Sequence, residues 1–323
     1  MIGKYHGTDL MIDVIGDDYR MLQVISRFGI TLGFGDQTVA ETCKSAGVDL
    51  ETFLTIVNYL KDIHAPINKL VEHVNLRAIM LYLTNSHTYF VDYKLPAVRR
   101  KLIEAIDCSA RNQIAFLILK FYDEYAEDVS RHMEYENKHV HPHVENLLRG
   151  KLTSESFNTV VNQHSRNHAS IEKSISELKN IIIKYYPSDA NAQLLNDVLM
   201  DIYMVEEDLL THCHLEDTLF AACVRKLEEE VRKHGGEVVA ENQQGKDVRI
   251  NSTEELSERE KEVIRLVAMG LANKEIAEKM FIAVNTVMTH RRNISRKLEI
   301  HSPAGLTIYA IVNGLIRLED VKL

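Results

Sequence analysis

Two histidine–glutamate pairs with the same spacing carry most of the chemistry that this sequence could perform. His132 precedes Glu136 by four residues, and His212 precedes Glu216 by four residues. Residues four apart in an α-helix lie on one face, so each pair would present an imidazole and a carboxylate in the same direction. Imidazoles and carboxylates without thiolates suit iron or manganese, and two carboxylates could bridge two ions. Each pair is therefore half of a candidate metal site.

A further histidine precedes each pair at nearly the same distance. His87 lies 45 residues before His132, and His168 lies 44 residues before His212. A helical hairpin with arms of about 22 residues, roughly 33 Å at helical rise, would bring the two histidines of each hairpin to the same level. Chance does not easily produce a duplication that matches in spacing, residue type and order. This duplication therefore favours a metal site over an accidental grouping of histidines.

Two such hairpins packed as a four-helix bundle would aim all of these side chains at one interior point. The hairpin turns are predicted near Asp107–Ser109 and at Pro187–Asn191. Iron is favoured because bridging carboxylates and neutral nitrogens leave positions free for oxygen species. The predicted metal ligands are His87, His132, Glu136, His168, His212 and Glu216.

At these residues the chain resembles the hemerythrin family, and within it the bacterial repair-of-iron-centres proteins. The match covers roughly residues 72 to 230, including Leu95–Pro96 and the run from His212 to Phe220. The resemblance implies a non-haem di-iron centre in a four-helix bundle. His164, four residues before His168, is an open alternative as a second ligand or a neighbour of the site. A single ion, or haem bound through the same histidines, also remains open.

Composition and charge place few limits on the function. The 323 residues are 45% hydrophobic, which permits two or three domains with a sizeable core. The formal net charge is −9, and residues 254–323 hold 11 Lys and Arg against 10 Asp and Glu, so residues 1–253 carry −10. Without paired cysteine spacing, a signal peptide or an apolar run near 18 residues, we expect a cytoplasmic protein with reduced thiols and no membrane partner.

Residues 1–66 are predicted to form a small helical module. Helical apolar spacing occurs at Tyr19–Phe28, Thr38–Lys44 and Leu50–Leu60, with Gly29 and the turn Gly33–Asp36 between the first two. The module resembles the N-terminal domain of the repair-of-iron-centres proteins. That family carries adjacent cysteines where this chain has Gly33–Asp36, so thiol chemistry at that position is absent here.

Several histidines and one cysteine near the predicted ligands are expected to be bystanders. His139, His141 and His143 alternate around a proline and share no helical face with Glu136, so they are predicted to form a solvated helix end. Cys213, next to His212, is the cysteine whose oxidation could affect the site. A buried, unreactive cysteine is nevertheless the favoured interpretation.

The bundle is expected to span residues 72–231 and to be followed by a linker at 232–253. The linker segment is polar and contains Gly235–Gly236 and Gly245. A short strand at 237–240 paired with 247–250 is an alternative for part of it.

The C-terminal residues 254–323 contain several residues typical of helix starts and ends. Ser257 and Glu260 form a capping box at the start of a helix that stops at Gly270. Asn273 is predicted to cap a second helix, Lys274–Met280, and Asn285 a third, which reaches about Leu298. A helix, a short turn and a second helix form the geometry that lays the second helix in the major groove of DNA.

The third of these helices divides into two faces. Val287, Ile294 and Leu298 recur at helical spacing and should pack inward. Residues 285–298 contain four basic residues and no acid, which indicates contact with phosphates. The side chains expected to point outward are Thr286, Met288, Thr289, Arg292 and Arg296.

Over some 60 residues this segment resembles the LuxR-type helix-turn-helix, in runs such as Gly270–Ala277 and Thr289–Ile294. The resemblance implies base contacts by Met288, Thr289 and Arg292, and dimerisation through a helix at about Ala304–Leu315. Met288 replaces a usual lysine and would contact a thymine methyl instead of guanine. The implied phosphate contacts are Lys274, Thr286, Arg291 and Lys297.

Together these observations predict an all-α chain with a small N-terminal module, a hemerythrin-like bundle and a LuxR-type DNA-binding domain. The expected function is a homodimeric transcription regulator, not an enzyme, that binds double-stranded DNA. Its bundle would sense oxygen, nitric oxide, redox state or iron through a small ligand or redox change at the iron. The alternatives are an iron-handling or oxygen-reactive di-iron protein and a haem-binding sensor.

Overall fold

The computed structural model of the chain describes residues 3–106, 113–153, 156–186, 192–234, 238–239, 256–298, 300, 302–317 and 320–321, with the side chains of 113, 153, 158–167 and 238–239 left out. In these ranges the chain is all-α apart from two strands of two residues each, which confirms the predicted fold class. None of the described helices has the length and apolar character needed to cross a bilayer. The chain divides into two compact units, and each is described by itself.

Unit 1 consists of Met1–Tyr93, Ser130–Asn167 and Glu207–Gln244. Its N-terminal part confirms the predicted helical module and adds a first helix, α1, that the sequence pattern did not reveal. Thr38 and Glu41 form a capping box at the start of α3, and Asp49 caps α4. The helices are α1 Met11–Asp17, α2 Met21–Arg27, α3 Val39–Ala46, α4 Leu50–Lys61, α5 Ile67–Leu70 and the 3₁₀ turn η1 Val71–His73.

The N-terminal module and the neighbouring bundle segments of unit 1 share one hydrophobic core. Phe53 and Tyr59 of α4 are buried in the same cluster as Tyr82, Val140 and Leu219, which belong to segments far apart in the sequence. Burial of large aromatic side chains of this kind stabilises a fold by roughly 2 to 3 kcal/mol each. The module is therefore part of the folded body that surrounds the candidate site.

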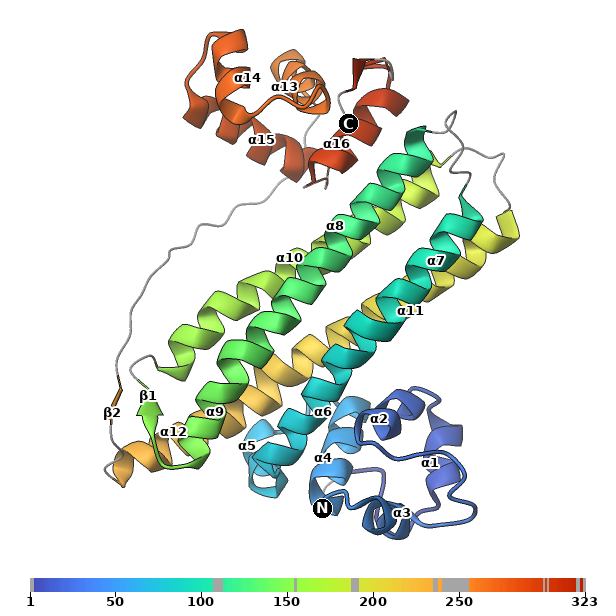
Figure 1. Cartoon of the computed structure of the whole chain (residues 1–323), viewed down its shortest axis with the longest axis vertical. Helices are drawn as coiled ribbons and strands as arrows, with labels where there is room; N and C mark the ends of the chain where they lie inside the picture. The colour runs from blue at the N-terminus through green and yellow to red at the C-terminus, as the bar shows by residue number, and fades with distance from the viewer. Residues whose placement is uncertain are drawn as a thin grey trace. The chain divides into compact units, whose positions relative to one another are not determined.

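Four long helical segments build the hemerythrin-like region (Figure 1). Three of them contain a π-helical stretch. The predicted hairpin turns at 107–109 and 187–191 lie outside the described residues. The elements are α6 Leu76–Thr88, η2 Tyr89–Lys94, α7 Leu95–Ala105, α8 Gln113–Tyr135, η3 Glu136–Val140, α9 His141–Leu148, α10 Phe157–Tyr185, α11 Ala192–Leu215, η4 Glu216–Phe220 and α12 Ala221–Lys233.

Unit 2 consists of Lys94–Val129, His168–Glu206 and Gly245–Leu323. Polar contacts join α11 to α7 and to the last residue of η2, and join α7 to α8. Lys94 and Lys101 both pair with Asp201, and Arg99 forms two hydrogen bonds to Asp123. The Tyr122 hydroxyl donates to the Leu95 carbonyl over 2.8 Å. These contacts link the three helices to one another.

The two short strands lie in unit 1. β1 (Leu152–Thr153) pairs in parallel with β2 (Val238–Val239). The alternative that paired 237–240 with 247–250 is thus replaced by a pairing with a segment far earlier in the chain, and residues 247–250 lie outside the described residues. The predicted linker 232–253 lies mostly outside them as well, and the predicted domain boundaries remain predictions.

The C-terminal helices of unit 2 form a small domain with its own core. Val263, Leu266, Ile276, Val287 and Ile294 are buried together. The described C-terminal helices are α13 Glu258–Ala268, α14 Asn273–Met280, α15 Val284–Leu298 and α16 Pro303–Val312.

Candidate metal centre and DNA-binding helix

Four of the predicted ligands converge in the interior of unit 1. His87 lies on α6, His212 on α11, and Glu136 and Glu216 are the first residues of η3 and η4. Each offers one ligand atom, and these atoms all lie within 4.8 Å of one another. This is the convergence of imidazoles and carboxylates that the duplicated spacing predicts.

The distances show how the two carboxylates connect the histidines. His87 Nε2 lies 3.1 Å from Glu136 Oε2 and 3.6 Å from Glu216 Oε1. His212 Nε2 lies 3.3 Å from Glu216 Oε1, and His132 Nε2 lies 3.7 Å from the other oxygen of Glu136, Oε1. All five side chains are at most 7% exposed. Each oxygen of Glu136 therefore faces a different histidine.

The donor set fits a metal cation. Both ring nitrogens of His212 are buried without a well-formed hydrogen bond among the described residues, and Nε2 has its 3.3 Å approach to the Glu216 carboxylate instead. A buried polar atom without a partner is costly, and a ligand that fills the position removes that cost. A cation held between the imidazoles and carboxylates would satisfy His212 and neutralise the buried negative charges.

A π-helical stretch begins at each of the two carboxylates, Glu136 and Glu216. η3 starts at Glu136 and η4 starts at Glu216, each at the end of a His-x-x-x-Glu segment. π-helical turns insert one extra residue per turn and occur frequently at functional sites. The local helix geometry is thus duplicated together with the sequence spacing.

The π-helical turn explains why the prediction for the His139–His143 cluster is wrong for two of its three members. His139 is exposed, but His141 is only 9% exposed and His143 only 6%. The His141 backbone N–H bonds to the Glu136 carbonyl, five residues earlier. A turn of five residues brings His141 back to the side of Glu136, whereas the α-helical period used in the prediction would carry it away.

Two further side chains hold His87 in place. Its Nδ1 lies 2.9 Å from the Asn137 side-chain oxygen, so the ring donates there and turns Nε2 toward the carboxylates. The second ring nitrogen of a metal-ligating histidine is commonly fixed in this way. The His141 ring stacks on His87 with centroids 5.8 Å apart and planes 7° apart. Neither Asn137 nor His141 was predicted to contribute to the site.

The charges at the centre are strongly coupled. Burial disfavours a charged His87, but hydrogen bonds and attraction from Glu136 and Glu216 outweigh burial and raise the pKa of His87 to about 10. Glu216 is opposed by burial as well, yet His212 and His87 hold its pKa well below the usual range. Burial, reinforced by His87, lowers the pKa of His141 to about 4, so its ring is neutral at pH 7.

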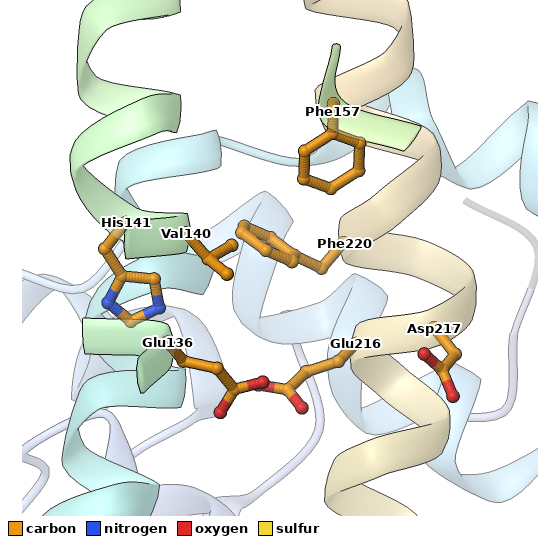
Figure 2. A pocket seen from close by; sticks show the side chains of 7 residues that line it. All are labelled: Glu136, Val140, His141, Phe157, Glu216, Asp217 and Phe220. Atoms are coloured by element: carbon orange, nitrogen blue, oxygen red, sulfur yellow. The ribbon is translucent and has the colours of Figure 1, made fainter. Parts of the chain in front are cut away.

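A small pocket lies directly beside the carboxylates (Figure 2). Its volume of about 20 Å³ suits a molecule little larger than water. In Figure 2 the carboxylates form one wall, and one ring nitrogen of His141 is turned toward the space between them and Phe220. The lining residues are Glu136, Val140, His141, Phe157, Glu216, Asp217 and Phe220.

His132 and His168 are the other two predicted ligands. His132 offers a ligand atom within 4.8 Å of atoms from Cys213 and Glu216. His168, which begins the second segment of unit 2, is buried on α10, and its ligation remains a prediction. The His164 side chain lies outside the described ones. Burial raises the pKa of the Cys213 thiol well above its usual value, so an unligated Cys213 stays protonated and poorly reactive.

The buried Arg27 side chain of the N-terminal module contacts residues close to the candidate metal site. The Arg27 guanidinium lies 2.6 Å from Asp208, which is one helical turn before His212 on α11. It also lies over the ring of Phe90 at 5.1 Å, and Phe90 in turn meets the His212 ring edge-on at 5.8 Å. The helical pattern of residues 19–28 gave no signal for this contact, because only the tertiary fold brings α2 and α11 together.

In the C-terminal domain the capping box of Ser257 and Glu260 is confirmed. The residues predicted to cap the next two helices lie inside the observed helices instead of before them. Ala272, not Asn273, is the N-cap of α14, because the Glu275 carboxylate bonds to its backbone N–H. α15 begins at Val284 and therefore contains Asn285 in its first turn. The predicted turn contains Phe281, whose left-handed backbone (φ 54°) ends α14.

The faces of α15 agree with the amphipathic prediction. Val287 and Ile294 are fully buried, while Met288 is 50% exposed. Leu298 and Arg296 are only partly buried, between the two predicted faces. The other predicted DNA-contacting side chains that are exposed are Lys274, Thr286, Thr289 and Arg292.

Two basic side chains of α15 make contacts inside the domain. Arg291 donates to the Asn273 side chain over 2.7 Å and is partly buried. The Lys297 ammonium lies 2.9 Å from Glu260, in an ion pair whose side chains are 9% and 4% exposed. The structure thus places the Lys297 charge against α13, although the family resemblance assigned it to a phosphate.

The fold and the site define a helical metal-binding domain followed by a helix-turn-helix. The family model described as the hemerythrin HHE cation binding domain matches residues 55–224, and the model described as bacterial regulatory proteins of the luxR family matches residues 254–310. The chain therefore belongs to the hemerythrin HHE family, with a LuxR-type DNA-binding domain at its C-terminal end.

Curated relatives match parts of the chain. The oxygen regulatory protein NreC of Staphylococcus carnosus is 43% identical over 79 residues, which are 23% of this chain and 36% of that protein. The response regulator protein VraR of Staphylococcus aureus is 30% identical over 147 residues, 46% of this chain and 67% of that protein. The chain thus spans about a third of the length of the first and two thirds of the second. No solved structure matches the chain.

Proposed function

We propose that this chain is a transcription regulator whose hemerythrin-like domain senses oxygen, nitric oxide, redox state or iron through a non-haem di-iron centre. The proposal joins the cation-binding family of residues 55–224 to the DNA-binding family of residues 254–310. The proposed metal ligands are His87, His132, Glu136, His168, His212 and Glu216.

The single observation that carries the proposal is the position of the two carboxylates between the histidines. The two oxygens of Glu136 face His87 and His132, and Glu216 belongs both to the group with His87 and to the group with His132. A carboxylate that lies between two sets of histidine nitrogens is suited to bridge two metal ions. Haem would need open space for a macrocycle, whereas the pocket at the site is about 20 Å³. When bound, the metal would supply an open coordination position.

The proposed partner is double-stranded DNA, and the exposed polar face of α15 supports this assignment. Arg292, Thr289 and Met288 lie on the exposed face opposite the buried Val287 and Ile294. We propose that these three read base edges while Lys274 and Thr286 contact phosphates. We also propose that the protein acts as a homodimer through the region of α16, as the LuxR resemblance implies.

Metal analysis together with an optical spectrum of the purified protein tests the proposal directly. About two iron ions per chain with the absorption of a ferric non-haem centre would support it. A Soret band would assign the histidines to haem, and a metal-free protein with a featureless spectrum would remove the sensing site. A titration of promoter DNA fragments with the same preparation tests the DNA-binding half separately.

A further inference from the structure

Helix α2 of the N-terminal module contacts two of the helices that carry candidate metal ligands. The Asn85 side-chain amide on α6 donates to the Arg27 carbonyl over 2.7 Å, two residues before His87. The Arg27 guanidinium pairs with Asp208 on α11 over 2.6 Å, four residues before His212. The last residue of α2 is therefore bonded to both helices, each time within about one helical turn of a candidate ligand.

The Arg27 guanidinium is buried between a carboxylate and three aromatic rings. The Arg27 side chain is 4% exposed, and the Asp208 side chain is 20% exposed. The guanidinium lies over the rings of Phe90, Tyr89 and Tyr82, at 5.1, 5.4 and 5.9 Å from the ring centroids. Arginine keeps its charge in proteins, and the attraction between a cation and aromatic faces is stronger where both are desolvated. These contacts hold the guanidinium between α11 on one side and the segment of α6 and η2 on the other.

Phe90 connects the guanidinium to the candidate metal site. Its side chain is fully buried, and its ring meets the His212 ring edge-on, with centroids 5.8 Å apart and planes 68° apart. The His212 ring also meets the His87 ring edge-on at 5.1 Å. Two routes therefore connect Arg27 to His212: the ring of Phe90, and the turn of α11 that begins at Asp208.

Removal of the Arg27 charge acts on both routes. A largely buried carboxylate such as Asp208 moves toward water when its partner is removed, because an unpaired buried charge is costly. A shift of this turn of α11 carries His212 with it, since residues four apart lie on the same face of the helix. Substitution of the residues that orient metal ligands typically lowers metal affinity by roughly 10- to 100-fold.

We propose that Arg27 is a positioning residue for the metal centre, through which the N-terminal module controls how firmly the bundle retains iron. This inference rests on the proposed metal centre and adds a role for the N-terminal module. The Arg27 side chain holds the turn of α11 that ends at His212, and the Arg27 carbonyl holds α6 next to His87. The module thus limits the relative movement of two helices that each carry a ligand.

The test measures how fast the full-length ferric protein loses iron to an excess of chelator, at a temperature well below the unfolding transition. Arg27→Met removes the charge and keeps a long side chain. We expect about tenfold faster iron release and a changed absorption spectrum of the ferric centre, because the His212 ring is no longer held in place. Asp208→Asn removes the same ion pair from the side of α11 and should have a similar effect. The effects should not add in the double variant, since both substitutions remove one interaction.

Asn58→Ala is the matched control for a loss of stability in the N-terminal module. Asn58 is 7% exposed, and its side chain forms two hydrogen bonds with the backbone of Tyr5. The control should lower the melting temperature but leave iron release and the spectrum as in the unmodified protein. Arg27→Lys is a milder variant that keeps a cation beside Asp208 but lacks the planar group that lies over the rings. Its rate of iron release should lie between those of the unmodified protein and Arg27→Met.

The outcomes separate this inference from the metal proposal. Faster iron release and a changed spectrum in Arg27→Met and Asp208→Asn, but not in Asn58→Ala, support the inference. Equal release rates in Arg27→Met and Asn58→Ala overturn it, because Arg27 would then act only on overall stability. If Arg27→Met does not fold, unchanged release from both Arg27→Lys and Asp208→Asn overturns it equally. An unmodified protein that holds no iron refutes the metal proposal, and this inference with it.

Discussion

At the scale of single residues, Glu136 is the side chain on which the proposed metal centre would depend most directly. Its two oxygens face His87 and His132, and the side chain is 3% exposed. Replacement by glutamine keeps the shape but removes the charge that would hold a cation. A metal site contributes folding free energy through its ligands, so loss of the metal also destabilises the bundle.

We therefore expect Glu136→Gln to lower the iron content well below that of the unmodified protein and to lower the melting temperature. Glu134→Gln is the matched control, because Glu134 is exposed and its partner among the described residues is Lys138, four residues away. Exposed pairs of this kind contribute at most about 1 kcal/mol. Equal iron content in both variants would show that Glu136 is not a ligand.

The Lys297–Glu260 pair allows a second prediction about a single residue. Burial alone would raise the pKa of Glu260. The hydrogen bond from Lys297 and the hydrogen bonds with Ser257 together outweigh burial and lower that pKa. A carboxylate with a lowered folded-state pKa contributes stability above its unfolded pKa, near 4.3, and that stability is lost as the pH falls further. Lys297→Met removes the partner and leaves a buried carboxylate.

We expect Lys297→Met to destabilise the C-terminal domain by about 3 kcal/mol at neutral pH, as when one partner of a buried pair is removed. The deficit should shrink as the pH falls below about 4, because the unpaired carboxylate of the variant is then protonated and is no longer a buried charge. Chemical denaturation at pH 7 and pH 3.5 measures both values. If stability is unchanged but the salt dependence of DNA binding falls by about one unit, Lys297 contacts phosphate instead.

At the scale of elements, α15 is the segment whose role the structure makes most testable. Its exposed face carries Arg292, and its buried face carries Val287 and Ile294. We expect Arg292→Ala to weaken binding to a specific site by about 1 to 3 kcal/mol and to relax base preference. Lys279→Ala, an exposed basic residue on α14 outside the proposed contacts, is the control. A uniform loss over all sequences would reassign Arg292 to a phosphate.

The contact of α2 with α11 is the second element-scale test. Arg27 is buried between Asp208 and the rings of Tyr89 and Phe90. Arg27→Met should destabilise unit 1 by about 3 kcal/mol, because it leaves Asp208 without its partner. Arg77→Met, in a more exposed pair with Glu145, should cost less than about 1 kcal/mol. Thermal unfolding of both variants tests this prediction. Equal melting temperatures would mean that the Arg27–Asp208 pair does not stabilise unit 1 more than the Arg77–Glu145 pair does.

The helices and the convergence of four candidate ligand side chains could be predicted because their signals are local and repeated. His87, Glu136, His212 and Glu216 meet because the pattern of spacing fixes their level in a helical hairpin. His141 escaped prediction because its position depends on the π-helical turn of η3, which the 3.6-residue period does not describe. Arg27 escaped because its ion-pair partner Asp208 lies 181 residues away in the chain, and only tertiary packing connects them.

At the scale of the whole molecule, the proposed function requires that two domains affect one another. The hemerythrin-like domain has buried ligands and a pocket for a small molecule, while α15 carries the surface proposed to bind DNA. By linkage, a change at the metal alters DNA affinity only if the two states of the metal favour different states of the DNA-binding domain. The same coupling must make DNA change the affinity of the bundle for its ligand.

We expect the ferric, ferrous, nitrosylated and metal-free forms to differ in affinity for a promoter fragment by roughly 5- to 150-fold, the usual range of coupling free energies of about 1 to 3 kcal/mol. Fluorescence anisotropy at one fixed protein concentration measures this, because dimerisation also changes apparent affinity. Glu136→Gln, which should hold little iron, is the internal control and should behave as the metal-free form in all four treatments. Affinities that agree within about a factor of two across the four forms would mean that the bundle does not regulate DNA binding. An iron-handling or oxygen-reactive role for the bundle, or control at a step after binding, would then be the better account.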